Sequence, residues 1–275
     1  MKNKNNIISD ASFHTHTFRC KHATGEVIDY ARNAFEAGSR TLGISDHVPL
    51  PDGRWPEARM AFSELDDYTD AIEFAQKALP DLKILKGMEC EYAPEYNSYF
   101  KDELLGERAY DYLIGAGHYT PLAGTWINSF ENLKTASALK AYSTYLAQTM
   151  ESGLFAFIAH PDLFGCSNTR WSADLAACSR DIFQAAEATK TPLEINGYGF
   201  RKPPVQSAEG LRPRYPWRPF WEMAADYDIQ VICNADAHRP KDVLANIKDA
   251  KDLANAFKLE IIDHLPTPVS DTKKT

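Results

Sequence analysis

A chain of 275 residues, 44% hydrophobic and 25% charged, has enough material for a sizeable core and suits one large α/β domain. Its formal net charge of −8 excludes a general nucleic-acid-binding surface, which needs clustered Lys and Arg, but leaves room for a local basic pocket. No apolar run reaches transmembrane length, the first residues lack a signal-peptide core, and the five cysteines are scattered. We therefore expect a cytoplasmic protein without a disulfide framework.

Apolar or β-branched runs alternate with amphipathic segments along the chain. Strands are predicted at residues 11–17, 40–45, 82–92, 110–117, 155–159, 192–196 and 229–234. Helices are predicted at residues 24–37, 63–79, 131–152, 172–189, 216–227 and 240–257. Since no repeat, linker or low-complexity segment divides the chain, we expect one domain over residues 1–275, with its core at about 10–258 and a tail at 259–275.

Strands that alternate with helices predict parallel βα units, which form either an open doubly wound sheet or a closed barrel. Histidines and carboxylates recur at or just past the C-terminal ends of these strands. In a barrel those ends converge on one face, whereas in an open sheet they lie too far apart to share a site. A (β/α) barrel is therefore favoured. The residues in question are His14, His16, His47, Glu89, His118, His160, Asp236 and His238.

The segment from Phe13 to His22 is the densest part of this pattern. Side chains of an extended segment alternate between two faces, so His14 and His16 should point the same way, and His22 can fold back from the following loop. Two histidines on a solvated strand face would be the plain alternative for such a pair on its own. Imidazole and carboxylate ligands suit zinc, iron or manganese, and nine candidates exceed the roughly four to six that one ion needs. We therefore predict two to three divalent ions that share a carboxylate, with His264 outside the site.

Seven motifs occur in a recognisable order: HTHTFRCKHA, ISDHVPLP, GMECEY, IGAGHY, IAHPDL, EINGYGFRKP and ICNADAHRP. With them the chain resembles the PHP superfamily, named for polymerases and histidinol phosphatases, and most closely its monofunctional histidinol-phosphate phosphatases. The resemblance implies a distorted (β/α)7 TIM-like barrel with a trinuclear metal site on the C-terminal face. It implies a first ion held by His14, His16, Glu89 and Asp236, a second by Glu89, His118 and His160, and a third by His22, His47 and His238.

The activity that the resemblance implies is metal-dependent hydrolysis of L-histidinol phosphate to L-histidinol and phosphate, in histidine biosynthesis, by a metal-bound hydroxide. Glu89, Asp236 and His238 are the expected catalytic residues, and Arg201 is expected to bind the substrate phosphate. The expected partner is a small phosphate ester, with no nucleic acid and no membrane, and the oligomeric state is not predicted. The alternatives are a PHP-type phosphodiesterase or phosphatase acting on nucleotides or oligonucleotides, and a non-catalytic metal- or phosphate-binding protein.

Residues beside the motifs have two interpretations each. Asp46 either orients an imidazole or caps a helix, and Glu91 either pairs with a substrate amine or is a solvated carboxylate. Cys20 is either a small buried residue or a ligand. The loop at residues 49–62 is either a lid or a plain connection, and the Arg-, Pro- and aromatic-rich segment 203–219 either binds substrate or covers the rim. Arg170, in the loop after His160, is a further candidate cation for the site.

Overall fold

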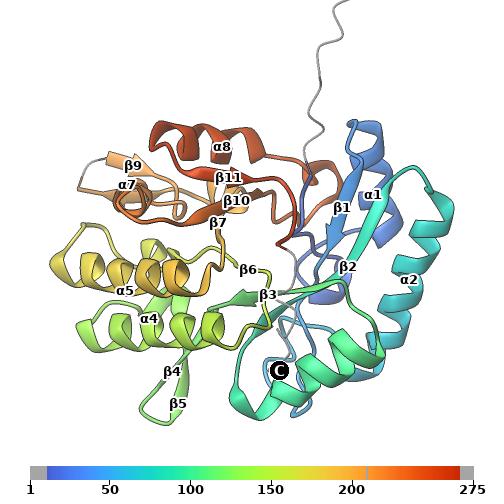
Figure 1. Cartoon of the computed structure of the whole chain (residues 1–275), viewed down its shortest axis with the longest axis horizontal. Coiled ribbons are helices and arrows are strands. Elements are labelled where there is room, and N and C mark those ends of the chain that lie inside the picture. The colour runs from blue at the N-terminus through green and yellow to red at the C-terminus, as the bar shows by residue number, and fades with distance from the viewer. Residues whose placement is uncertain (1–10, 209, 267–275) are drawn as a thin grey trace, which may run out of the picture.

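The computed structural model describes residues 11–208 and 210–266. Seven parallel strands form one strongly curled sheet with the order β1-β2-β3-β6-β7-β10-β11, and the helices pack around its outside (Figure 1). This architecture confirms the predicted distorted (β/α)7 barrel. The strands are β1 (Thr41–Ile44), β2 (Lys83–Glu91), β3 (Tyr112–Ala116), β6 (Phe157–Ile158), β7 (Leu193–Asn196), β10 (Gln230–Asn234) and β11 (Glu260–Ile262).

The predicted first strand at residues 11–17 is not a regular strand. Ser12 forms a parallel bridge with Leu42 of β1, while Thr15 forms one with Ala237, just after β10. The segment therefore changes partner within a few residues, which prevents a continuous ladder with either neighbour. Its effect is to join the two sides of the curled sheet at the C-terminal ends of the strands.

Amphipathic helices cover the outside of the sheet, as the hydrophobic periodicity predicts. In α1 (Val27–Glu36) the buried residues Val27, Tyr30, Ala31 and Ala34 form one stripe, and a capping box around Glu26 starts the helix three residues later than expected. The other long helices are α2 (Leu65–Ala78), α4 (Ala136–Glu151), α5 (Ala173–Thr189), α7 (Arg218–Ala224) and α8 (Ile247–Ala256). Among the described residues, no helix combines the length and the apolar character that crossing a membrane requires.

Three predicted boundaries are wrong. The helix expected at 131–152 is divided into α3 (Ser129–Asn132) and α4, because Thr135 leaves the helical conformation and caps the second helix through Ala138 N. The helix expected at 240–257 starts with a 3-10 turn, and α8 begins only after Asn246 in a left-handed conformation. The predicted tail at 259–275 contains β11, which pairs with β10 and belongs to the sheet. Residues 267–275 of that tail lie outside the described residues.

Short elements that were not predicted surround the C-terminal rim of the barrel. An antiparallel hairpin of β4 (Tyr119–Leu122) and β5 (Thr125–Asn128) follows β3, and a second hairpin of β8 (Val205–Ser207) and β9 (Gly210–Arg212) follows β7. Between β7 and the second hairpin lies the single-turn helix α6 (Tyr198–Arg201). A π-helix at Tyr99–Glu107 precedes β3.

The barrel interior is filled by its own apolar cluster beneath the rim. Tyr112 crosses the interior, donates a hydrogen bond to the carbonyl of Phe13 at 2.7 Å, and occupies the space that a side chain on Gly43 or Gly87 would need. This packing closes the barrel below the functional face. The cluster consists of Phe13, Tyr112, Ile114, Ala116, Phe157, Ala159, Ile232 and Ile262.

Candidate metal centre

All nine ligands predicted from the sequence lie together at the C-terminal face of the barrel. His14 and His16 come from the bridging segment, His22 follows the 3-10 turn Phe18–Cys20, and the others sit in or just after β1, β2, β3, β6 and β10. His14 is fully buried, and the other eight line a cavity of about 120 Å³. The residues that line it are His16, His22, His47, Ala58, Arg59, Glu89, His118, Tyr119, Asn128, Phe130, His160, Tyr198, Lys202, Tyr215, Asp236 and His238.

The carboxylate of Glu89 lies at the centre of this group and faces two sets of histidines. Its Oε2 is 3.3 Å from His14 Nε2, 3.4 Å from His16 Nε2 and 3.0 Å from His47 Nδ1. Its Oε1 is 3.3 Å from His118 Nε2 and 3.1 Å from His160 Nε2. One carboxylate therefore has an oxygen in each of two ligand clusters, which is the arrangement a bridging ligand needs.

Asp236 completes the first cluster from the opposite end of the chain. Its Oδ1 is 3.2 Å from His16 Nε2, 3.7 Å from His14 Nε2 and 3.4 Å from His238 Nδ1. Asp236 has a φ of 48° and His160 a φ of 30°, a backbone conformation that residues other than glycine rarely adopt. Such strain is typical of positions whose side chains are held for function.

A third cluster consists of His22, His47 and His238, whose ligand atoms lie within 4.8 Å of one another. Nδ1 of His22 is 2.7 Å from the Cys20 carbonyl, and Nδ1 of His238 is 3.1 Å from the Asp236 carbonyl. A ring that donates from Nδ1 is left with Nε2 as its free lone pair. Both rings are therefore set to coordinate through Nε2.

Buried carboxylates hold three further ligand rings from behind. His14 Nδ1 is 2.8 Å from Glu194 Oε1, His16 Nδ1 is 3.4 Å from Asp46 Oδ1, and His118 Nδ1 is 2.5 Å from Glu91 Oε1. Such partners fix the ring orientation and the tautomer of a ligating histidine. Asp46 thus lies where it can orient an imidazole, which is one of the two interpretations that the sequence allowed. Glu194 was missed because it lies in the apolar strand β7, and a charged residue inside such a strand was the signal available.

Carboxylates and histidines of the cluster shift one another's pKa values. Burial alone would raise the pKa of Glu89 and Asp236, yet the surrounding histidines hold both pKa values well below the usual range. Against the effect of burial, Asp236, Asp46 and Glu89 raise the pKa of His16 to about 9. Burial lowers the pKa of His47 to about 3. The carboxylates are thus ionised and draw positive charge to the position that the histidines share.

The donor set fits divalent metal ions. Buried atoms without a hydrogen-bond partner in the described chain point inward: both Glu89 oxygens, His14 Nε2, His47 Nδ1 and Asp236 Oδ1. Glu89 Oε1, His118 Nε2 and His160 Nε2 form a triangle with sides of 3.1–3.3 Å. Bonds of about 2.0–2.1 Å in a tetrahedron would separate neighbouring ligand atoms by about 3.3 Å. An ion would satisfy these atoms where no protein group does.

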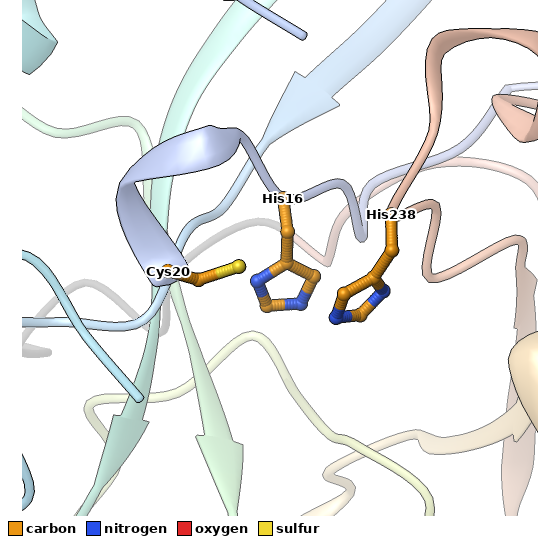
Figure 2. Close-up of side chains that lie close together, drawn as sticks. All are labelled: His16, Cys20 and His238. Atoms are coloured by element: carbon orange, nitrogen blue, oxygen red, sulfur yellow. The ribbon is translucent and has the colours of Figure 1, made fainter. Parts of the chain in front are cut away.

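Cys20 lies beside this cluster, and Figure 2 shows its sulfur directed at the His16 ring, with His238 on the other side of that ring. Its Sγ is within 4.8 Å of ligand atoms of His16 and His238, and the residue is completely buried. Burial raises the pKa of the Cys20 thiol well above its ordinary value. Cys20 is thus a buried residue, and its sulfur lies close enough to His16 and His238 for the interpretation as a ligand to stay open.

Arg201, predicted to bind the substrate phosphate, does not reach the cavity. Its Nη1 donates to the carbonyls of Gly197 and Ala245 and to Asn246 Oδ1, and its Nη2 donates to the carbonyls of Ala235 and Asp236. The guanidinium thus stabilises the backbone behind Asp236. This position corrects the prediction that Arg201 binds the substrate phosphate. The next residue, Lys202, lines the cavity instead.

The other regions considered from the sequence have separate positions. Arg170 is exposed and is absent from the cavity wall. In the segment 203–219, Arg212 donates to the carbonyls of Gly165 and Asn168 and so fastens the rim, while Tyr215 reaches the cavity. The loop at residues 49–62 brings Ala58 and Arg59 to the cavity wall.

Fold and site together define a (β/α) barrel with a cluster of metal-ligand side chains at its C-terminal face. The family model for the PHP domain matches residues 12–197, a span that holds all the predicted ligands except Asp236 and His238. The chain is 30% identical, over 250 residues, to the protein named "Probable histidinol-phosphatase" of Deinococcus radiodurans, covering 86% of this chain and 89% of that one. The chain belongs to the PHP family.

The fold also resembles that of a solved histidinol phosphate phosphatase from Lactococcus lactis subsp. lactis. The two superpose with a TM-score of 0.71 at 15% sequence identity, over 92% of this chain and 95% of that chain. That enzyme was solved in complex with zinc, L-histidinol and phosphate. At this level of identity the likeness establishes the shared fold.

Proposed function

We propose that this protein is a metal-dependent phosphomonoesterase that hydrolyses L-histidinol phosphate to L-histidinol and phosphate. The observation that carries the proposal is the position of Glu89, whose two oxygens face two separate sets of histidines across a cavity. A family relative bears the name of this activity, and a protein of the same fold binds zinc, histidinol and phosphate. The non-catalytic alternative is disfavoured because the full set of ligand side chains is present.

The nine side chains would hold two to three ions of zinc, iron or manganese. Oxygen and nitrogen donors in this mixture suit all three metals, and the described residues offer no thiolate cluster that would favour another. When bound, such ions lower the pKa of a coordinated water and neutralise phosphoryl oxygens. Glu89 and Asp236 would supply the anionic ligands, and His238 would supply an imidazole ligand at the cavity wall.

Lys202 is the proposed cation for the substrate phosphate in place of Arg201. Its Nζ lies 4.1 Å from the centre of the Tyr198 ring and 5.8 Å from that of Phe130, and it makes no ion pair within the described residues. Burial lowers the pKa of Lys202, although Asp236 counteracts this effect. A phosphate in the cavity would give this ammonium the counter-charge that it lacks.

In the reaction a water oxygen bonds to phosphorus, the bond between phosphorus and the ester oxygen breaks, and that oxygen leaves with a proton.

A small monoester suits the cavity better than a nucleic acid. A volume of about 120 Å³ is below the few hundred Å³ of typical ligand pockets, so it admits a terminal phosphate group rather than a polymer backbone. Apart from histidines, the cations on its wall within the described chain are Arg59 and Lys202. The net charge of −8 also disfavours a polyanionic substrate.

Turnover of a panel of esters by protein with its metals counted tests the proposal. The panel holds histidinol phosphate, other small monoesters, a bis-aryl phosphodiester and a short single-stranded oligonucleotide. We expect histidinol phosphate to have the highest kcat/KM, of at least about 10⁴ M⁻¹s⁻¹. Preferential cleavage of the diester or the oligonucleotide would support the nucleotide alternative, and turnover of no ester by the metal-loaded protein would refute the proposal.

A further inference from the structure

We propose that Arg59, carried into the cavity by the loop after β1, binds the phosphoryl group of the substrate through its free N–H groups. The inference rests on the proposed phosphatase function and deepens it by assigning a second phosphate-binding cation. Neither the sequence motifs nor the strand-end pattern indicated this residue, because it lies in the irregular segment 49–62.

The guanidinium of Arg59 is buried, with only 2% of the residue exposed, and it is held in place from two sides. Its Nη1 donates to the Val48 carbonyl at 2.7 Å, and its Nη2 donates to Glu91 Oε2 at 2.7 Å. A guanidinium has five N–H bonds, so these contacts leave three. One of them is on Nε, a buried atom that has no partner among the described residues, and the side chain lines the cavity.

A buried cation with unused donors is costly unless an anion meets it. Among the described residues, Glu91 is the carboxylate that pairs with Arg59, and its other oxygen, Oε1, is 2.5 Å from His118 Nδ1. The charge of Glu91 is therefore shared between Arg59 and a histidine of the cluster. Each oxygen of Glu91 thus has its own partner, Arg59 at Oε2 and His118 at Oε1. Glu91 is therefore held by two protein groups, which disfavours its pairing with a substrate amine, while Arg59 keeps an unpartnered donor at Nε.

A phosphate monoester supplies that charge in a suitable form. It brings up to two negative charges and several oxygens, and a guanidinium offers a planar set of donors that can meet two of them. The plane is held by Trp55, whose ring centre is 5.1 Å from the Arg59 guanidinium carbon. Trp55 itself stacks on Tyr119 of the β4–β5 hairpin, with ring centres 4.0 Å apart and planes at 4°. The donors of Arg59 are thus fixed before the substrate arrives, which limits the entropy lost on binding.

The same contacts make Glu91 a positioning residue. It joins Arg59 to His118, whose Nε2 lies 3.3 Å from Glu89 Oε1. A phosphate that is held by Arg59 would therefore lie on the side of the cavity that His118 and His160 occupy. Arg59 and the bridging carboxylate would meet the same group from two directions.

The test compares Arg59→Lys and Arg59→Gln with Arg54→Lys in metal-loaded protein. Arg54 is a matched control because it lies in the same loop and its guanidinium is also near the Trp55 ring, at 5.5 Å, yet it is absent from the cavity wall. The readouts are the Kd of inorganic phosphate by calorimetry, kcat and KM for histidinol phosphate, and metal content. Arg59→Lys keeps the charge and tests the geometry, so it decides the question if Arg59→Gln does not fold.

We expect both Arg59 variants to bind phosphate about 10- to 100-fold more weakly, with a matching rise in KM and unchanged metal content. Arg54→Lys should stay within twofold of the parent. A Kd for phosphate within twofold of the parent in Arg59→Lys and Arg59→Gln, or no phosphate binding by the parent, would overturn the inference. Phosphate binding needs no turnover, so a parent that hydrolyses no ester would refute the proposed function while the phosphate titration still tests Arg59.

Discussion

The carboxylate of Glu194 lies 2.8 Å from Nδ1 of His14, so that this buried ring presents Nε2 to Glu89 and Asp236. Glu194 is itself completely buried and accepts further hydrogen bonds from Asn196 Nδ2, Asn234 Nδ2 and the His160 amide. One carboxylate in β7 therefore sets the orientation of His14 and fixes the backbone at His160.

Replacement of Glu194 should weaken metal binding without removing a ligand. Glu194→Gln keeps the size of the side chain but loses the negative charge that fixes the tautomer of His14. Loss of such a partner typically costs about 10- to 100-fold in metal affinity. Competition with a chelator, followed by metal analysis, measures the change. Glu222→Gln, at an exposed position of α7, should match the parent, and equal affinity in both variants would show that Glu194 has only a packing role.

Removal of the central carboxylate should have the largest effect on metal content. The parent is expected to bind two to three ions, and Glu89→Ala removes an oxygen from each of two ligand clusters. Elemental analysis should therefore show a loss of at least one ion per chain, together with the activity. The exposed Glu73 provides the control substitution. Near-normal metal content in Glu89→Ala would exclude a bridging role.

Substitutions at the neighbouring residues Arg201 and Lys202 should have different consequences. Lys202→Met removes one of the two non-histidine cations on the described cavity wall and should lower kcat/KM by about 10- to 100-fold with little change in stability. Arg201→Ala removes donors to four backbone carbonyls and should lower the free energy of unfolding by about 2–3 kcal/mol. Kinetics and denaturant unfolding of both variants separate the two roles. The reverse pattern would restore Arg201 as the substrate-binding residue.

The buried Asp162 predicts a dependence of stability on pH. Burial raises its pKa to about 7, while Trp217 N and Trp221 Nε1 donate to its Oδ2. The folded pKa is above the unfolded value of about 3.9. The contribution of Asp162 to the free energy of unfolding is therefore fully present below about pH 4 and is lost as pH rises towards about 7. Asp162→Asn keeps an acceptor and removes this loss.

Unfolding of parent and Asp162→Asn in the presence of chelator, from pH 4 to pH 8, measures the effect. The free energy of unfolding of the variant relative to the parent should increase by up to about 4 kcal/mol over this range. Curves that run parallel across the range would show that Asp162 titrates normally in the folded protein.

The positions of the ligands followed from the sequence because the topology of the fold brings all parallel strand ends to one face. The positions of the residues that orient these ligands did not follow from the sequence. Glu194 sits among apolar neighbours in β7, where a single sequence predicts core packing, and its partner His14 is far away in the chain. Arg201 and Lys202 are adjacent, and which of them faces the cavity depends on where the short helix α6 ends, at Arg201. A shift of one residue in the end of α6 would change which side chain faces the cavity, and sequence patterns do not locate helix ends to one residue.

Arg59 shows the same limit in an irregular loop. Its position depends on a hydrogen bond to Val48, a salt bridge to Glu91 and contact with Trp55, and none of these has a periodic signal. The strand β11 was missed because three residues, Glu260–Ile262, are too few for a reliable pattern. The bridging segment at residues 12–15 was predicted as a regular strand because extended chain and ladder have the same sequence pattern.

That bridging segment also determines when the metal site can exist during synthesis. His14 and His16 leave the ribosome early, whereas Asp236 and His238 emerge only after most of the barrel strands have been made. Until then the two early histidines lack the carboxylate beside them and the neighbour Ala237 that fixes their backbone. Ion capture by the first cluster is consequently a late event, and a chain truncated before β10 would carry histidines that bind metal only weakly and without order.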